Sequence, residues 1–157
     1  MIYLIVIILL LSLIFLSYII YNKKSKKMQQ LYIPLDLAKY ICSLYDMNNI
    51  QLQKILLYLQ IQYLKEYNCP LFVESFIKQR KYFVVNSVYL YFCGFGSTLI
   101  YYKFPDEIPL DNEIQQFICK QLDNISSFDI NTYYNYLLFN TNKDNINYQD
   151  LKKLFIK

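Results

Sequence analysis

The sequence predicts a mainly α-helical protein: a small helical domain with a minor short β element, preceded by one N-terminal transmembrane helix. Residues 2–21 are apolar and uncharged, and apolar side chains recur at helical spacing through most of the later chain. Short stretches rich in β-forming residues interrupt that spacing. At 157 residues, we expect one domain with an appendage: a membrane helix over 2–21, a basic tether over 22–30 and a domain over 31–157.

The segment Ile2–Tyr21 has the composition of a membrane-spanning helix. It contains no charge, Gly or Pro, and fifteen of its twenty residues are Ile, Leu, Val or Phe. A helix of this length spans ~30 Å, the thickness of the hydrocarbon core. A cleaved signal peptide is the alternative, but a basic leading region and an A-x-A site are lacking and the apolar run is long. We therefore expect an uncleaved anchor.

Four lysines follow directly in the segment 22–30: Lys23, Lys24, Lys26 and Lys27. By the positive-inside rule they predict a single-pass protein of the cell membrane whose C-terminal domain is cytoplasmic. The lysines either bind anionic lipid as well or serve only to stop translocation.

The domain after the tether is electrically neutral. Four of the 16 Lys and Arg residues lie in the tether and all 12 acidic residues follow it, which leaves 12 bases against 12 acids. A neutral domain with a single arginine, Arg80, predicts no nucleic-acid partner. The chain has no histidine, which excludes Ser-His-Asp and Cys-His mechanisms and removes the commonest metal ligand.

The domain begins with a predicted helical hairpin. Residues 33–45 form an amphipathic helix, and 46–49 form a polar turn. Residues 49–66 follow as the central helix, with apolar side chains on two faces and Asn49 as a candidate cap. We expect Leu56 and Leu59 to be buried.

Shorter elements follow. Asn68-Cys69-Pro70 ends the central helix, and residues 71–82 predict a short strand or extended segment with a solvated turn at 79–81. By propensity alone, residues 84–93 suit a helix or a strand, and Gly94-Phe95-Gly96 must end this element. Further predictions are a strand over 97–103, a loop over 105–109, and helices over 112–122, 130–139 and 148–156, the first of them capped by Asp111.

Residues 52–60, L-Q-K-I-L-L-Y-L-Q, resemble the L-Q-K-L-L-Y-x-x-Q signature of the Panacea family, the SocA-like antitoxins and phage-associated proteins of bacteria. The resemblance extends over residues 33–139. It includes Asp36–Ile41, the run Cys69-Pro70-Leu71-Phe72 with Glu74, and a later segment with Val84, Val85, Val88, Tyr89, Gly94 and Gly96. It implies a helix over 84–93. This chain has Gln79–Phe83 where the family has W-x-Y-G-P.

The resemblance implies a membrane-anchored protein-binding module that acts like an antitoxin, sequestering a toxin encoded nearby or another protein. The alternative is a membrane-tethered adaptor or structural protein that has lost antitoxin activity, which the missing W-x-Y-G-P motif favours. Loops collect binding residues, so we predict that Arg80, Tyr82 and Phe83 lie at the partner surface. The competing interpretation places Tyr82 and Phe83 in the core and leaves Arg80 solvated.

Catalytic chemistry has weaker support in the sequence. The four cysteines, Cys42, Cys69, Cys93 and Cys119, lack paired spacing, so we expect neither a zinc site nor a cofactor. Cys69, beside Pro70, is the one candidate reactive thiol. The carboxylates Asp106, Glu107, Asp111 and Glu113 cluster at a helix start, where capping explains them. We therefore do not expect this protein to be an enzyme. After the antitoxin and the adaptor, an enzyme that uses carboxylates or Cys69 is the third hypothesis.

Overall fold

The computed structural model describes residues 10–18, 31–101, 108–123 and 125–156. The chain divides into two units, Met1–Gln30 and Leu31–Lys157. The described part of the first unit is a helix over residues 10–18. All the other described helices and strands belong to the second unit.

The predicted transmembrane helix over 2–21 is contradicted. Among the described residues, no helix combines the length and the apolarity needed to cross a bilayer. Residues 2–9 and 19–21 and the predicted tether over 22–30 lie outside the described residues. The predicted location as a single-pass membrane protein is contradicted by the same finding.

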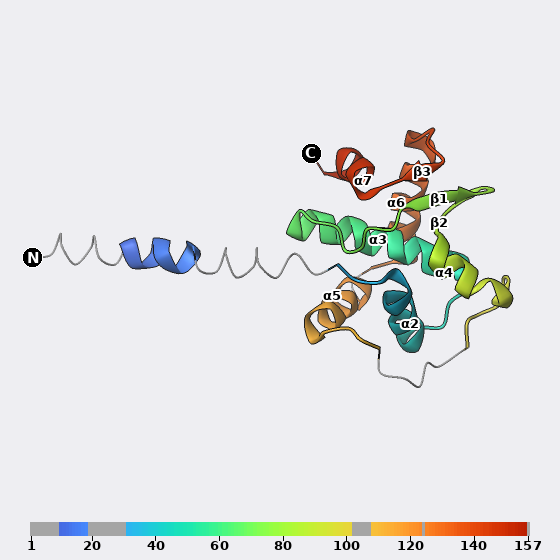
Figure 1. The fold of residues 1–157 in the computed structure, drawn as a ribbon, viewed down its shortest axis with the longest axis horizontal. Coiled ribbons are helices and arrows are strands. Elements are labelled where there is room, and N and C mark those ends of the chain that lie inside the picture. The colour runs from blue at the N-terminus through green and yellow to red at the C-terminus, as the bar shows by residue number, and fades with distance from the viewer. Residues whose placement is uncertain (1–9, 19–30, 102–107, 124, 157) are drawn as a thin grey trace, which may run out of the picture. The chain divides into compact units, whose positions relative to one another are not determined.

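The second unit is mainly helical with a small sheet, as predicted (Figure 1). Its elements, in chain order, are α2 (Pro34–Leu44), α3 (Asn49–Tyr67), β1 (Phe76–Gln79), β2 (Tyr82–Val85), α4 (Asn86–Tyr91), the 3-10 helix η1 (Cys93–Phe95), α5 (Asn112–Asp123), α6 (Ser127–Asn140), β3 (Asn145–Ile146) and α7 (Tyr148–Phe155).

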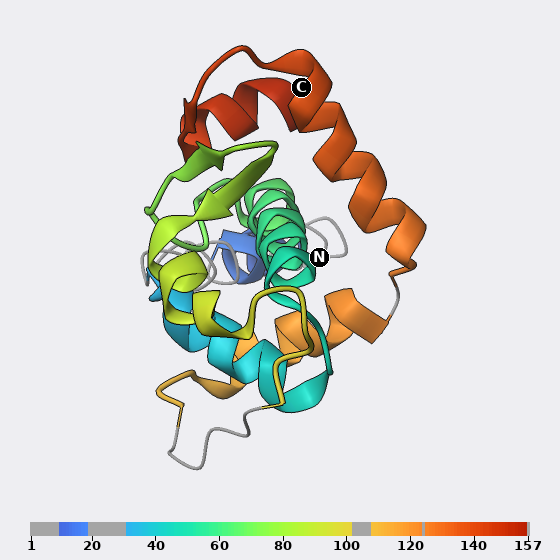
Figure 2. The ribbon, with the colours of Figure 1, turned by 90° about the vertical axis from the view of Figure 1, so that its right-hand side faces the viewer.

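Helix α3 is the centre of this unit. It contacts α2, α4, α5, α6, α7 and β2, and Figure 2 shows it end-on with the other elements around it. Leu56 and Leu59 are completely buried, which confirms their prediction. The helix starts with a capping box in which Asn48 and Gln51 exchange side-chain and backbone hydrogen bonds. The cap is therefore Asn48, one residue before the predicted Asn49, whose side chain is buried instead.

Buried amide side chains fasten other segments to α3. The Oε1 of Gln60 accepts hydrogen bonds from the backbone N–H groups of Leu71 and Phe72, and its Nε2 donates to the carbonyl of Phe72 at 3.0 Å. An extended segment crossing a helix has no backbone partner there, so one glutamine supplies both the acceptor and the donor. These hydrogen bonds fix to α3 the segment that connects this helix to the sheet.

The sheet has the strand order β2-β1-β3, and both pairs are antiparallel. Val84 and Val85 lie opposite Ile77 and Phe76 in the hairpin. The helix predicted over 84–93 is therefore wrong for these two valines, and α4 starts only at Asn86. Branched side chains fit a pleated surface with partners across the strand, and here that pairing decides the local structure.

The strand predicted over 97–103 is wrong within its described part. Residues 97–101 form no strand, and residues 102–103 lie outside the described residues. The N–H of Ile100 donates to the carbonyl of Met47 at 2.8 Å, and the Ile100 side chain is buried. The segment is thus held to the α2–α3 turn by its backbone without joining the sheet.

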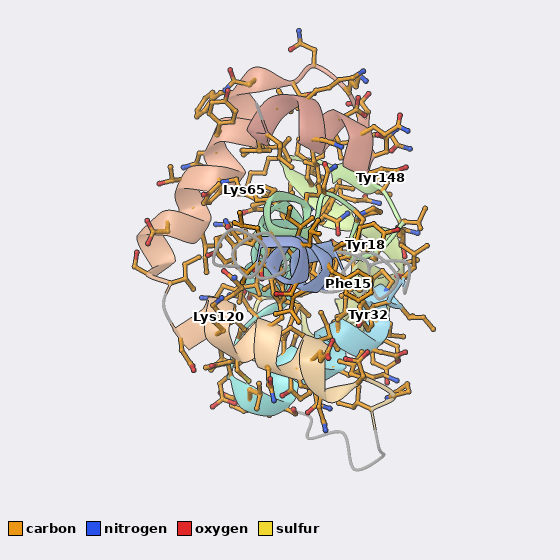
Figure 3. The ribbon with its side chains drawn as sticks, turned by 90° about the vertical axis from the view of Figure 1, so that its left-hand side faces the viewer. Phe15, Tyr18, Tyr32, Lys65, Lys120 and Tyr148 are labelled. Atoms are coloured by element: carbon orange, nitrogen blue, oxygen red, sulfur yellow. The ribbon has the colours of Figure 1, made fainter. Side chains whose placement is uncertain are left out.

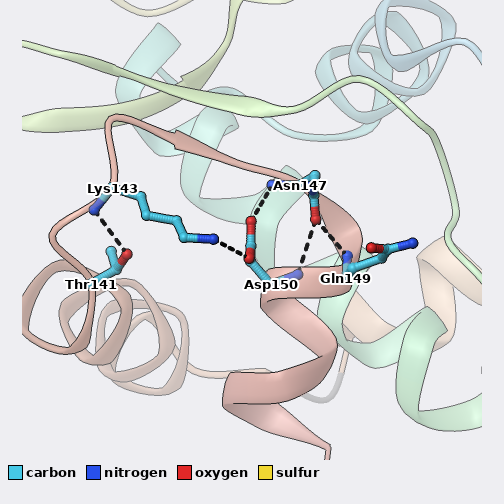
Figure 4. A network of polar contacts seen from close by, with 5 residues as sticks. All are labelled: Thr141, Lys143, Asn147, Gln149 and Asp150. Carbon is cyan, nitrogen blue, oxygen red and sulfur yellow. Dashed lines mark hydrogen bonds and ion pairs between the residues drawn. The ribbon is translucent and has the colours of Figure 1, made fainter.

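The C-terminal elements begin at capping motifs. Asp111 accepts from the N–H of Ile114, as predicted for the start of α5. Helix α6 starts three residues earlier than predicted because Ser126 and Asp129 form a capping box. Asn147 and Asp150 form another at α7, where Lys143 also binds Asp150 (Figure 4). The two-residue strand β3, which the sequence did not predict, precedes this last cap.

Candidate functional site

The tip of the β1–β2 hairpin is a two-residue turn formed by Arg80 and Lys81. Arg80 has a φ of 57°, a left-handed conformation that favours glycine. Two-residue hairpin turns need positive φ values because the twist of the strands demands them. The turn therefore holds a strained arginine outward at the end of the sheet.

Three cations gather at this tip: Lys78, Arg80 and Lys81, all of them exposed. The sequence has no acidic residue between Glu74 and Asp106. Glu74 is already engaged, since its carboxylate accepts from the N–H and the hydroxyl of Ser87. Within the described part of the chain, none of the three cations has an ion-pair partner. The N–H of Lys78 donates to the carbonyl of Asp144 at 2.8 Å, which places an acidic residue beside Lys78, so the positive charge at the hairpin tip rests on Arg80 and Lys81.

A hollow of about 470 Å³ lies beside this tip, and we call it the hairpin hollow. One wall comes from the hairpin through Gln79, Arg80 and Tyr82. The opposite wall comes from α4, η1 and the residues after them, through Tyr89, Cys93, Gly96 and Ser97. The start of α3 completes the lining with Asn49 and Ile50. The volume lies within the range of natural ligand pockets.

A buried hydrogen-bond relay fixes the two walls to α3. The Nδ2 of Asn49 donates to the carbonyl of Tyr89 at 3.0 Å, and the Nε2 of Gln53 donates to the Oδ1 of Asn49 at 3.2 Å. The Oε1 of Gln53 accepts from the N–H of Val85 at 2.8 Å. Strand β2 and helix α4 are thus joined through two amides that are almost completely buried. The relay sets the distance between the walls of the hollow.

The structure brings together two of the three predicted partner-binding residues. Arg80 is exposed and Tyr82 is half-buried, and both line the hairpin hollow. The ammonium of Lys81 lies 5.4 Å from the centre of the Tyr82 ring. Phe83 does not belong to this surface, because its side chain is only 1% exposed.

Phe83 belongs to the core instead, as the competing interpretation proposed for it. Its N–H donates to the hydroxyl of Tyr134 at 2.6 Å. Successive side chains of a strand point to opposite faces, so Tyr82 and Phe83 cannot both face a partner. The opposite wall, which includes Tyr89 in α4 and Ser97 after η1, was missed because only the fold turns these residues back toward the hairpin.

Among the described residues, the candidate reactive cysteine has no group that would favour its thiolate, and the candidate carboxylate Asp111 is bound in structural contacts. Burial raises the pKa of Cys69, the predicted reactive thiol, so the structure disfavours its thiolate. Asp111 caps α5 and accepts from the hydroxyl of Tyr32 at 2.8 Å. Asp106 and Glu107 lie outside the described residues. Across the described ranges, no group of three His, Cys, Asp or Glu side chains is arranged to hold a metal.

The thiols should react with a maleimide in an order set by exposure and pKa. Cys93 is exposed and should be alkylated first, and Cys69 should follow more slowly because burial raises its pKa. Burial raises the pKa of Cys42 to about 12, so this thiol stays protonated near neutral pH and should react last. Timed alkylation with peptide mass mapping tests this order, and labelling of Cys42 before Cys93 would contradict it.

Comparison with known proteins gives no relative: no family model, curated protein or solved structure matches this chain.

Proposed function

We propose that residues 31–157 form a protein-binding module that takes an acidic segment of a partner protein into the hairpin hollow. We further propose, from the Panacea resemblance, that the module acts like an antitoxin and sequesters that partner. The observation that carries the proposal is Arg80, which lines the hollow, has no ion-pair partner among the described residues and lies beside the exposed Lys81 in the turn.

Charge favours an acidic segment as the ligand. A guanidinium binds a carboxylate with two parallel hydrogen bonds, and Arg80 has no such partner within the described ranges. Lys81 adds to the field at the same tip and would steer an acidic partner toward it. Since the domain as a whole is neutral, the residues outside the tip carry a net negative charge, and this tip is where an acidic partner gains most.

Aromatic surface supports the same proposal. Tyr82 and Tyr89 face the hollow from opposite walls and are half-buried, so each offers ring area and a hydroxyl. Tyrosine and arginine are the residue types that most often dominate interface energies. The buried Asn49–Gln53 relay holds both walls in place before a partner arrives, which lowers the cost of binding.

A matched pair of variants tests this function. Arg80→Gly with Tyr82→Ala removes the two side chains, and glycine also relieves the left-handed strain at position 80, so the fold should persist. Each side chain is expected to contribute about 2 kcal/mol, so binding should weaken by at least about a hundredfold. The control, Lys153→Ala with Tyr101→Ala, removes one cation and one exposed tyrosine outside the lining and should bind normally.

The assay uses the product of the gene encoded beside this one, which the antitoxin proposal expects to be small and toxic when expressed alone. Wild type and control should restore growth on co-expression, and the Arg80→Gly, Tyr82→Ala variant should not. Binding of the product should also protect Cys93, which lines the hollow, from alkylation. Equal rescue by all three proteins would show that the hollow is not the binding surface.

An adaptor that has lost antitoxin activity is the second candidate function. The observation that favours it is the replacement of W-x-Y-G-P by Gln79–Phe83, because Gln79, Arg80 and Tyr82 from this segment line the hollow. An adaptor would bind a partner and protect Cys93 without restoring growth. The same assay therefore separates the two candidates.

A further inference from the structure

A second hollow, of about 340 Å³, lies on a different part of the domain, and we call it the α3–α6 hollow. It is formed by the turn after α2, the first half of α3, the end of α5 and the start of α6. Five apolar side chains line it: Met47, Ile55, Leu122, Ile125 and Ile130. None of them lines the hairpin hollow, so the two cavities are separate sites.

Lys54 places a positive charge in this apolar hollow. Its Nζ donates to the Oδ1 of Asn131 at 2.8 Å and lies 5.4 Å from the centre of the Tyr134 ring. Both partners are uncharged, and among the residues that the structure describes Lys54 forms no ion pair. A half-buried cation without an anion is a favourable contact point for a negatively charged ligand.

The neighbouring amides have donors available. The Oδ1 of Asn131 accepts from Lys54, and the Oε1 of Gln51 accepts from the N–H of Asn48 at 2.9 Å. Each amide oxygen thus already accepts one hydrogen bond, while the NH₂ group of each side chain can donate to a ligand. Together with the ammonium of Lys54, these groups present donors at the polar side of the hollow.

The one carboxylate in the lining limits the ligand's charge. Asp46 is exposed at the α2–α3 turn and makes no ion pair within the described ranges. Its negative charge lies in the same hollow as Lys54 and would repel a ligand that carries a second negative charge. The chemistry is thus one anionic group beside Lys54 and an apolar body against the five apolar side chains.

We infer that the α3–α6 hollow binds a small amphipathic monocarboxylate, whose carboxylate contacts Lys54 and whose apolar body fills the space between α3, α5 and α6. The inference does not depend on the proposed protein partner, because the two hollows share no lining residue. Binding joins elements from both halves of the second unit and should raise its stability.

Octanoate is the probe, titrated calorimetrically into the full chain. Wild type should bind octanoate at least about tenfold more tightly than octanol, because only octanoate gains a charge-assisted hydrogen bond. Lys54→Gln should weaken octanoate binding about tenfold or more and leave octanol binding unchanged. The matched control is Lys65→Gln on the same helix: Lys65 (labelled in Figure 3) donates to the hydroxyl of Tyr133 and does not line the hollow.

A blocking variant keeps the test decisive if Lys54→Gln is poorly folded. Ile130→Trp fills the apolar part of the hollow and should abolish octanoate binding while leaving Cys93 alkylation at its wild-type rate. Three results would each overturn the inference. The first is octanol binding as tight as octanoate binding, and the second is leucine binding tighter than octanoate binding. The third is octanoate binding that is unchanged in both Lys54→Gln and Ile130→Trp.

Discussion

Replacing Gln60 by Leu should lower the free energy of unfolding by about 4 kcal/mol. Gln60 is 1% exposed and satisfies two backbone donors, at Leu71 and Phe72, and one backbone acceptor, at Phe72. Leucine has nearly the same size but offers no polar atom, so three buried backbone groups would lose their partners. Urea denaturation of the full chain should show a lower midpoint with an unchanged slope.

Gln62→Leu is the matched control. Gln62 lies on the same helix but is only half-buried, and its side chain binds the hydroxyl of Tyr133. Its replacement should cost within about 1 kcal/mol, because water can satisfy the groups it leaves. Similar losses from both substitutions would show that the buried amide of Gln60 has no special role.

Two glutamines among the residues that carry the family resemblance are therefore structural in this chain. Gln53 and Gln60 occupy the two glutamine positions of the L-Q-K-L-L-Y-x-x-Q pattern, and both are buried and bonded to backbone groups. In this chain the two glutamines hold β2 and the segment after α3 against the central helix, and neither lines one of the two hollows.

Helices were predictable because their signals are local. Apolar spacing located α2, α3, α5 and α7 to within two residues at each end, and polar residues before α3, α5 and α7 supply caps. The three-residue error at α6 has the same origin, since Ser126 and Asp129 form a capping box ahead of the apolar run. A serine followed three residues later by an acid was the signal that could have corrected it.

The sheet was harder to predict because its strands depend on pairing. Val84 and Val85 are placed in β2 by Ile77 and Phe76 across a local hairpin, and β3 pairs with β1 from about seventy residues away. No sequence window of helical length contains both β1 and β3. The hollow beside the hairpin shares this difficulty, since Arg80 and Tyr82 meet a wall from α4 and η1 that only the fold brings near.

Lys54 illustrates the same limit for the α3–α6 hollow. In the sequence of α3, Lys54 is an ordinary polar position. Its uncharged neighbours, Asn131 and Tyr134, belong to α6 and contact it only in the folded domain. Phe83 is the opposite case. Strand alternation beside Tyr82 was visible in the sequence and would have placed Phe83 in the core.

Leu56→Asp should prevent the second unit from folding. Leu56 is completely buried in the middle of α3, which contacts six other elements of the unit. An aspartate there would be an unpaired buried charge that costs several kcal/mol, in addition to the lost apolar contacts of a leucine, about 2–5 kcal/mol. Together these losses approach the entire stability of a typical domain, about 5–15 kcal/mol.

The comparison variant is Leu90→Asp, which introduces the same charge at a leucine that is 57% exposed on α4. It should change the free energy of unfolding by no more than about 0.5 kcal/mol, since water solvates the new carboxylate. Circular dichroism and thermal melting of both variants check the contrast. A Leu56→Asp protein that melts within a degree or two of wild type would show that α3 is not the centre of the core.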